Sequence, residues 1–420
     1  MRRNTLTSVI LWSVISAAFI GPGTVTTAVS AGTQYGLQLL WAVVLATLGC
    51  IALQEISARI TIASGLTLGE SLVKKFGARK GVFLQWLIGG SVVLGCAAYE
   101  AGNILGAMSG LQLITGLRAE VLTFGIALAA AIILWMGGRN WISTLMTILV
   151  GLMGVAFAAL AFSQPLSLQT ILSASVTPVI PAGAELLVLG LVGTTIVPYN
   201  IFIGAGISKG ETIPLMRIGL SVSVAIGGLI TVAILIAGTS VESFSSFGEL
   251  STALGSQVGA WGSGALAWGL FAAGFSSAIT SPYATSIIAS SVFGVTRERH
   301  SRLAGIAVLI VGFTVAISGL QPIPVILAVQ AINGFILPLL TLFLLLIVND
   351  PLIMPLPHRH GKLYNIALLV IFFAVLLIGL NNLDKSASTL LHLAQTSHLA
   401  LIIVLSALIT LYTAWRIFKR

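Results

Sequence analysis

Apolar segments of about 20 residues recur along the whole chain, with short polar breaks between them. A helix of about 20 apolar residues spans the hydrocarbon core of a bilayer. Only 7% of the residues are charged and 57% are hydrophobic, whereas about a quarter of the residues of a soluble domain are charged. The alternation of polar and apolar residues that is typical of a transmembrane barrel is not visible. These features predict an all-α polytopic membrane protein whose main solvent is the lipid bilayer.

The apolar segments predict about twelve transmembrane helices within a single transmembrane domain, 1–420, and a short interfacial helix over 64–78. The start Met1-Arg2-Arg3 also fits a signal peptide, but the apolar run after it continues through a glycine-rich break into further helix, which favours a first span. The predicted spans are 8–33, 36–58, 81–110, 119–137, 141–163, 183–207, 214–240, 259–293, 302–320, 323–348, 363–381 and 398–417.

The basic residues predict the orientation of these spans. With the N-terminus inside, 18 of the 20 Lys and Arg residues fall on the cytoplasmic side, and Arg118 and Lys385 fall outside. Cytoplasmic loops of membrane proteins carry such an excess of Lys and Arg. We therefore expect a multi-pass protein of a bacterial cytoplasmic membrane with both termini in the cytoplasm. The same distribution explains the formal charge of +9, so we expect no nucleic-acid partner.

The motifs of common enzymes and cofactor sites are missing from the sequence. Walker-type loops, nucleophile elbows and zinc-protease motifs do not occur. Cys50 and Cys96 lie inside apolar runs, and the five histidines lie in polar segments between the spans. Haem or zinc ligation within the membrane therefore has few ligands available. We expect neither an enzyme nor a cofactor.

An internal repeat relates two blocks of five spans. Proline breaks the first span at Pro22 and the sixth at Pro198, which is 176 residues later, and Ala97-Ala98 and Ala272-Ala273 are 175 residues apart. Because five is an odd number of crossings, the second block starts on the opposite side of the membrane and is inverted relative to the first. Broken helices at corresponding positions of inverted repeats mark the binding site of many transporters. The expected parts are a first repeat over 8–163, a second over 183–348 and two additional helices over 363–417.

The two helix breaks are the candidate substrate site. A proline inside a span removes backbone hydrogen bonds, and in lipid this is tolerated where the break lines a cavity or is buried in protein. The freed amides favour anions and the freed carbonyls favour cations. A simple packing kink is the alternative, and a threonine in a span is commonly bonded to its own helix. The candidate residues are Gly21, Pro22, Gly23, Thr24, Thr194, Thr195, Val197, Pro198, Tyr199, Asn200 and Gln330.

Glu100 is the acidic residue placed deepest in a predicted span. A carboxylate at that depth is costly and points to function by default, which makes Glu100 a candidate proton carrier or charge partner of a cation. A neutral glutamic acid bonded to a neighbouring carbonyl is the alternative. Glu55 lies nearer a span end and four residues before Arg59, which is the spacing of a helical ion pair.

Several of these segments resemble the NRAMP family of proton-coupled divalent-metal transporters. Gly21–Thr24 and Ala31–Gly36 are similar to its first helix and the turn that follows, and Ser57–Arg59 to its second helix. Gly193–Asn200 resembles its metal-binding sixth helix, and Gly269–Gly274 its eighth. The resemblance covers most of the first ten spans. It implies a LeuT-like fold of two inverted five-helix repeats, here with two additional helices.

The metal-ligand motifs of that family are altered. Its first-helix motif reads Asp-Pro-Gly-Asn, whereas this chain has Gly21 and Thr24 at the aspartate and asparagine positions. Its sixth-helix motif reads Met-Pro-His, whereas this chain has Val197 and Tyr199. A site without carboxylate or thioether does not select Mn²⁺ or Fe²⁺ over hard cations. The chain is thus identified as a divergent member whose metal ligands are unassigned.

The resemblance and the residues together favour a secondary active transporter that moves a small cation by alternating access. A divalent metal ion is among the candidate solutes, and protons or the membrane potential would drive transport with Glu100 as coupling residue. A small organic solute, such as an amino acid or amine, is an alternative on the same fold. A membrane sensor or scaffold that does not transport is another.

Overall fold

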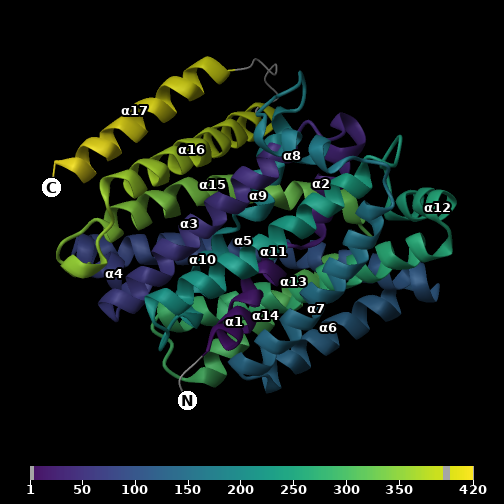
Figure 1. The fold of residues 1–420 in the computed structure, drawn as a ribbon. Coiled ribbons are helices and arrows are strands. Elements are labelled where there is room, and N and C mark those ends of the chain that lie inside the picture. Colours follow the sequence, from purple (N-terminus) through teal and green to yellow (C-terminus); the bar gives the residue numbers. More distant parts are fainter. Residues whose placement is uncertain (1–3, 391–397, 420) are drawn as a thin grey trace.

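The structure is a bundle of helices, seen in a computed structural model that describes residues 4–390 and 398–419, with side chains outside 324–335 and 385–390 (Figure 1). In chain order the α-helices of this described part are α1 (Thr5–Phe19), α2 (Pro22–Tyr35), α3 (Leu40–Ser64), α4 (Leu68–Phe76), α5 (Ala78–Thr115), α6 (Ala119–Met136), α7 (Arg139–Phe162), α8 (Leu168–Val176), α9 (Glu185–Thr195), α10 (Pro198–Ile207), α11 (Ile213–Gly238), α12 (Phe247–Val258), α13 (Ala260–Ser291), α14 (Glu298–Ala316), α15 (Pro322–Val348), α16 (Lys362–Leu390) and α17 (Leu399–Phe418).

The helices match the predicted spans. Ten are long and apolar enough to cross a membrane, or eleven when the bent pair of α1 and α2 counts as one span. The remaining predicted span, 323–348, corresponds to α15, whose apolar part Ile336–Val348 is described with its side chains. The prediction of an all-α protein with about twelve spans is confirmed. The bounds of individual helices differ from the predicted bounds by several residues, and α5 extends beyond the predicted 81–110 at both ends.

Three short α-helices, and the single-turn 3-10 helix Leu356–His358, lie between the spans in the described part of the chain. The predicted helix over 64–78 is α4, and its N-terminus is held by a capping box in which Thr67 and Glu70 bond each other's backbone amides. The helices α8 and α12 were not predicted. Each is preceded by a serine at the N-cap, Ser167 and Ser246, whose hydroxyl accepts a hydrogen bond from a backbone amide three residues later. Their 9 and 12 residues are too short to stand out as apolar segments.

The centre of the bundle is the contact between α5 and α13, the most extensive helix pair in the described part of the chain. Glycines permit this close approach, because an added Cβ at Gly110 or Gly274 would overlap the backbone of the facing helix. Small residues let helix backbones approach closely within membranes. These glycines therefore serve the packing of α5 on α13.

The two helix breaks have the same local geometry. Ile20 directly follows α1 and Ile196 directly follows α9, with φ/ψ of −83°/69° and −97°/80°. Each is followed by an extended residue and then by a proline at the first position of the next helix. The two sites are 176 residues apart. At the first break α1 and α2 form a bend of 63°. The expected bounds of the two repeats, 8–163 and 183–348, remain a prediction.

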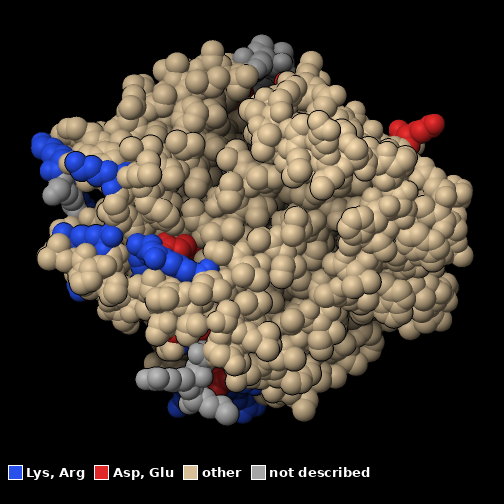
Figure 2. All heavy atoms as spheres, viewed as in Figure 1, with Lys and Arg blue, Asp and Glu red and all other residues tan. Residues whose placement is uncertain are grey.

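On the face of the molecule drawn in Figure 2, charged side chains lie at the ends of the bundle. Figure 2 shows Lys and Arg gathered at the end where α4 and the C-terminus of α17 lie, and a broad uncharged surface between this end and the opposite one. An uncharged belt of this kind is expected where a protein contacts hydrocarbon. Which end of the bundle faces the cytoplasm stays a prediction.

Candidate functional site at the two helix breaks

The sixth span contacts the first through polar side chains. The Tyr199 hydroxyl donates a hydrogen bond to the Ala18 carbonyl at 2.8 Å. The Asn200 side-chain amide donates to the Ile15 carbonyl at 3.4 Å. Both side chains are buried. Two of the predicted site residues thus meet the C-terminal turn of α1.

The remaining carbonyls of that turn also accept hydrogen bonds from hydroxyls. Thr24, at the start of α2, donates to the Phe19 carbonyl. Ser276 and Ser277 of α13 donate to the Ala17 carbonyl at 3.1 and 3.4 Å. The last carbonyls of a helix lack intrahelical partners, so neutral hydroxyls complete this helix end inside the bundle. A cation at this negative helix end would find carbonyl and hydroxyl oxygens around it.

Glu100 brings a carboxylate beside this oxygen-rich centre. Its side chain is fully buried, and Asn103, one turn further along α5, donates a hydrogen bond to Oε2 at 3.3 Å. Glu100 Oε1 makes no hydrogen bond with any described residue. A buried charge without a full set of partners is costly. This oxygen is therefore available to a proton or a cation.

Gly21 places the first break next to Asn103. A Cβ added to Gly21 would lie 2.8 Å from Ser277 Oγ and 3.8 Å from Asn103 Oδ1. One turn beyond Asn103, Gly106 packs so closely on Pro22 that an added Cβ would overlap the proline ring. The helix surface that carries Glu100 and Asn103 thus lies against the break. An aspartate at position 21, as in the resembling family, has no room here unless Ser277 moves.

The other predicted site residues are placed less directly. Thr194 and Thr195 donate to the carbonyl of Leu191 at 3.2 and 2.9 Å, so both hydroxyls are bonded within their own helix. Val197 is the buried, extended residue that precedes Pro198. The side chain of Gln330 lies outside the described residues.

Three residues of the centre were not predicted as site residues. Asn103 stands three residues after Glu100 and on the same helix face, a spacing that could have identified it. Ser276 and Ser277 gave no such indication, because hydroxyls occur throughout the apolar helices. Two further buried oxygens, Thr26 Oγ1 and Gln54 Oε1, make no hydrogen bond with any described residue.

The donor set fits few classes of ion. Within residues 4–390 and 398–419, no group of three or more His, Cys, Asp or Glu side chains could hold a metal ion. The centre offers one carboxylate and several neutral oxygens. Hard cations take oxygen ligands, and Mg²⁺ keeps several of its waters and uses only one or two carboxylates.

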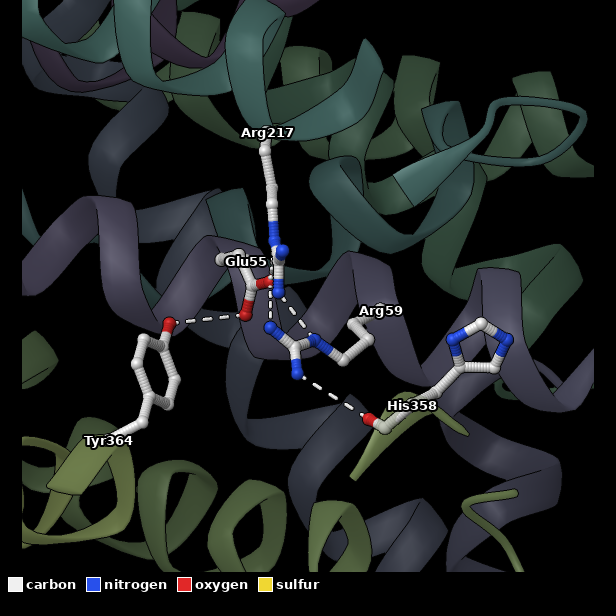
Figure 3. Close-up of polar contacts among 5 residues, drawn as sticks. All are labelled: Glu55, Arg59, Arg217, His358 and Tyr364. Carbon is white, nitrogen blue, oxygen red and sulfur yellow. Dashed lines mark hydrogen bonds and ion pairs between the residues drawn. The ribbon is translucent and has the colours of Figure 1, made fainter. Parts of the chain in front are cut away.

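A second polar centre, the Glu55 cluster, lies where α3, α11 and α16 meet (Figure 3). Glu55 accepts hydrogen bonds from Arg59 Nε at 3.0 Å, Arg217 Nε at 2.9 Å and the Tyr364 hydroxyl at 3.1 Å. Arg59 also donates to the His358 carbonyl at 3.4 Å. The sequence predicted the Glu55–Arg59 pair, whereas the partners on other helices come from the fold. The cluster fixes three distant segments at the basic end of the bundle.

His360 lies beside the Glu55 cluster in the loop before α16. Its ring contacts the Tyr364 ring edge to face, with 4.5 Å between centroids. Burial, together with the nearby Arg59 guanidinium, lowers the pKa of His360 to about 4. The imidazole therefore stays neutral at physiological pH.

Comparison with known proteins decides the family. The family model of the natural resistance-associated macrophage protein-like proteins, Nramp, matches residues 13–383. The chain belongs to this family. Nramp proteins are transporters and not enzymes, as the sequence predicted.

The relatives of this Nramp chain carry metal-transport names. A divalent metal cation transporter MntH from Verminephrobacter eiseniae is 28% identical over 294 residues, which are 66% of this chain and 66% of that protein. An MntH from Erwinia tasmaniensis is 24% identical over 390 residues, which are 87% of this chain and 91% of that protein.

Solved structures confirm the predicted LeuT-like fold. A manganese transporter from Eremococcus coleocola superimposes with a TM-score of 0.78 at 17% identity and covers 99% of this chain and 93% of its own. A nucleobase-cation-symport-1 family transporter in a closed conformation gives a TM-score of 0.53 at 16% identity. The match covers 98% of this chain and 92% of that transporter.

Proposed function

We propose that this Nramp chain is a secondary active transporter that moves a divalent metal cation through the bilayer by alternating access. The cation would lie between Gly21–Thr24 and Thr194–Asn200, with Glu100 as its charge partner. The geometry of the paired breaks supports this position, because carbonyls and hydroxyls from α1, α2, α10 and α13 converge there. The relatives named for divalent metal transport support the class of solute.

The observation that carries the proposal is the buried carboxylate of Glu100. It lies one turn before Asn103, which reaches the first break, and its Oε1 makes no hydrogen bond with any described residue. A carboxylate kept in such a place requires a proton or a cation for part of the transport cycle. Alternation between the two would couple metal movement to protons.

The missing ligand aspartate changes how the metal would be held. With one carboxylate and neutral oxygens, the site cannot strip all waters from a divalent ion at low cost. A partly hydrated ion bonded through its waters to Tyr199, Asn200 and the α1 carbonyls fits these donors. We therefore expect weak discrimination between Mn²⁺ and Mg²⁺.

The orientation completes the proposal. The basic end with α4 and the C-terminus of α17 would face the cytoplasm of a bacterium, and both termini would lie on that side. The excess of Lys and Arg at this end supports this direction.

Uptake into proteoliposomes tests the function. Purified protein is reconstituted, and Mn²⁺ and Mg²⁺ uptake is followed with and without an inward proton gradient. We expect saturable uptake that the gradient accelerates, and its loss in Glu100→Gln. Glu120→Gln, at an exposed residue paired with Arg118, is the matched control and should transport normally. Absence of uptake of either ion by folded wild-type protein would refute the proposal.

A small organic solute is the second candidate. It is favoured by the amides at the N-termini of α2 and α10, which suit a carboxylate, and by the lack of a three-ligand metal group among the described residues. Saturable uptake of an amino acid or amine, without uptake of either metal, would establish it.

A further inference from the structure

A groove opens between α4, α15 and α17 at the basic end of the bundle. Its volume is about 180 Å³. Its walls are mainly the side chains of Phe76, Leu342, Leu346, Ile409 and Ile417, and Lys75 and Arg416 lie at its polar end.

Two helix stripes form the groove. Leu342, Leu346 and Asn349 follow one another at helical spacing along α15, and Ile409 and Arg416 do so along α17. Seven residues of helix are about 10 Å long, so the groove is long and narrow. α17 packs chiefly on α16 and lies at the outer edge of the bundle (Figure 1). The groove therefore opens to the surroundings of the bundle.

The mouth of the groove is positively charged. Arg416 donates to the Tyr412 hydroxyl at 3.2 Å, and the Lys419 ammonium lies 4.5 Å from the centre of the Trp415 ring. Neither cation forms an ion pair with a carboxylate in the described part of the chain. Lys75 differs, because Asp350 neutralises it. Arg416 thus lines one end of the apolar groove as an unneutralised cation, and Lys419 follows it by about one turn at the end of the same helix.

Aromatic residues mark the depth of this mouth in the membrane. Tyr412 and Trp415 are exposed on α17, one turn or less from Arg416. Tyr and Trp are enriched where headgroups meet hydrocarbon, and long basic side chains reach to the same level. The cations of the mouth are therefore at the height of lipid phosphates, with the apolar groove below them.

We propose that this groove binds an anionic phospholipid, with an acyl chain between α15 and α17 and the phosphate at Arg416 and Lys419. Basic pockets between transmembrane helices on the cytoplasmic side bind anionic headgroups. A second copy of the chain fits the groove poorly, because a symmetric interface would bring the same cations against each other. The site does not depend on the transported solute.

Native mass spectrometry of the full-length protein tests the site. The delipidated protein is titrated with phosphatidylglycerol and with phosphatidylcholine of the same acyl chains. We expect tighter binding of phosphatidylglycerol, and a several-fold loss of that preference in the double variant Arg416→Gln/Lys419→Gln. The control Lys209→Gln/Lys362→Gln removes two exposed cations outside the groove and should bind as the wild type does. Equal binding of both lipids by the wild type, or an unchanged preference in the double variant, would overturn the proposal.

A further variant tests the contribution of the apolar groove to lipid binding independently of the two cations. Leu346→Trp fills the groove and leaves both cations, so it should weaken binding of phosphatidylglycerol. Its thermal unfolding is measured alongside to establish that it is folded. Unchanged lipid binding by folded Leu346→Trp would show that the acyl chain lies elsewhere and would overturn the proposal. Displacement of the lipid by millimolar inorganic phosphate would do so as well, because the site would then recognise a free anion.

Discussion

Removal of the carboxylate from the Glu55 cluster tests how the bundle is held together at its basic end. In Glu55→Gln, the guanidinium of Arg59 loses its counterion while its side chain stays only 6% exposed. Arg217 is 53% exposed and regains water as partner. The Tyr364 hydroxyl keeps an acceptor in the amide oxygen. The loss of stability is therefore expected to come mainly from the buried, uncompensated charge of Arg59.

The expected magnitude follows from that charge. Breaking a buried ion pair by removing one partner costs about 3–5 kcal/mol, and the amide retains part of the hydrogen bonding, so we expect about 3 kcal/mol. An unfolding entropy of about 2.1 cal/mol/K per residue gives about 0.9 kcal/mol/K for a chain of 420 residues. The midpoint should then fall by about 3 °C.

The chain carries its own probes for this measurement. Cys50 and Cys96 are both buried, so a thiol-reactive fluorophore labels them on unfolding and reports the midpoint. Glu298→Gln is the matched control, because Glu298 is 79% exposed in its pair with Arg302. Exposed pairs contribute at most about 1 kcal/mol, and the control should shift the midpoint by about 1 °C or less.

Two results would refute this reasoning. One is a shift in Glu55→Gln no larger than that in the exposed control. The other concerns the double variant Glu55→Gln/Arg59→Gln, which removes the uncompensated charge and should be more stable than Glu55→Gln alone. A double variant less stable than the single one would mean that Arg59 is stabilised by groups other than the carboxylate.

Three further predictions concern the site and the loop before α16. Gly312→Ala places a Cβ over the side chain of Glu100 and should strongly reduce uptake, whereas Gly264→Ala, in open space, should not; equal uptake by both would contradict this. Tyr199→Phe leaves a buried carbonyl of α1 without its donor and should lower the free energy of unfolding by about 1–3 kcal/mol, and an unchanged midpoint would count against the bond. The pKa of His360 is lower in the folded protein than in the unfolded chain, so stability should fall as the pH drops from about 7 towards 4; His360→Gln should lose less over this range, as measured by thermal unfolding at each pH.

The spans and the breaks could be predicted because lipid imposes simple rules. Every backbone group in hydrocarbon must be bonded within a helix, so apolar length locates the helices and proline locates the breaks. Pro22 and Pro198 are separated by nearly the same offset as the two Ala-Ala pairs, and this repeat indicated the candidate site. The depth of Glu100 in its span made it a candidate as well. Apart from the offset between the two prolines, these features depend on residues close together in the sequence.

The rest of the site depends on contacts that no local pattern encodes. The bonds from Ser276 and Tyr199 to the end of α1 exist because distant helices meet there, and serine and tyrosine are frequent in such chains. The same holds for Arg217 and Tyr364, which join Glu55 from other helices. α8 was missed because it is defined by its cap and not by apolar length.

The position of a bound metal tests the account most directly. Crystals of the protein soaked in Mn²⁺ would locate the ion by anomalous scattering. The account predicts one peak between Gly21–Thr24 and Thr194–Asn200, beside Glu100, and its disappearance in Glu100→Gln. A peak at another place in the bundle, or one that persists unchanged in Glu100→Gln, would contradict the proposed site.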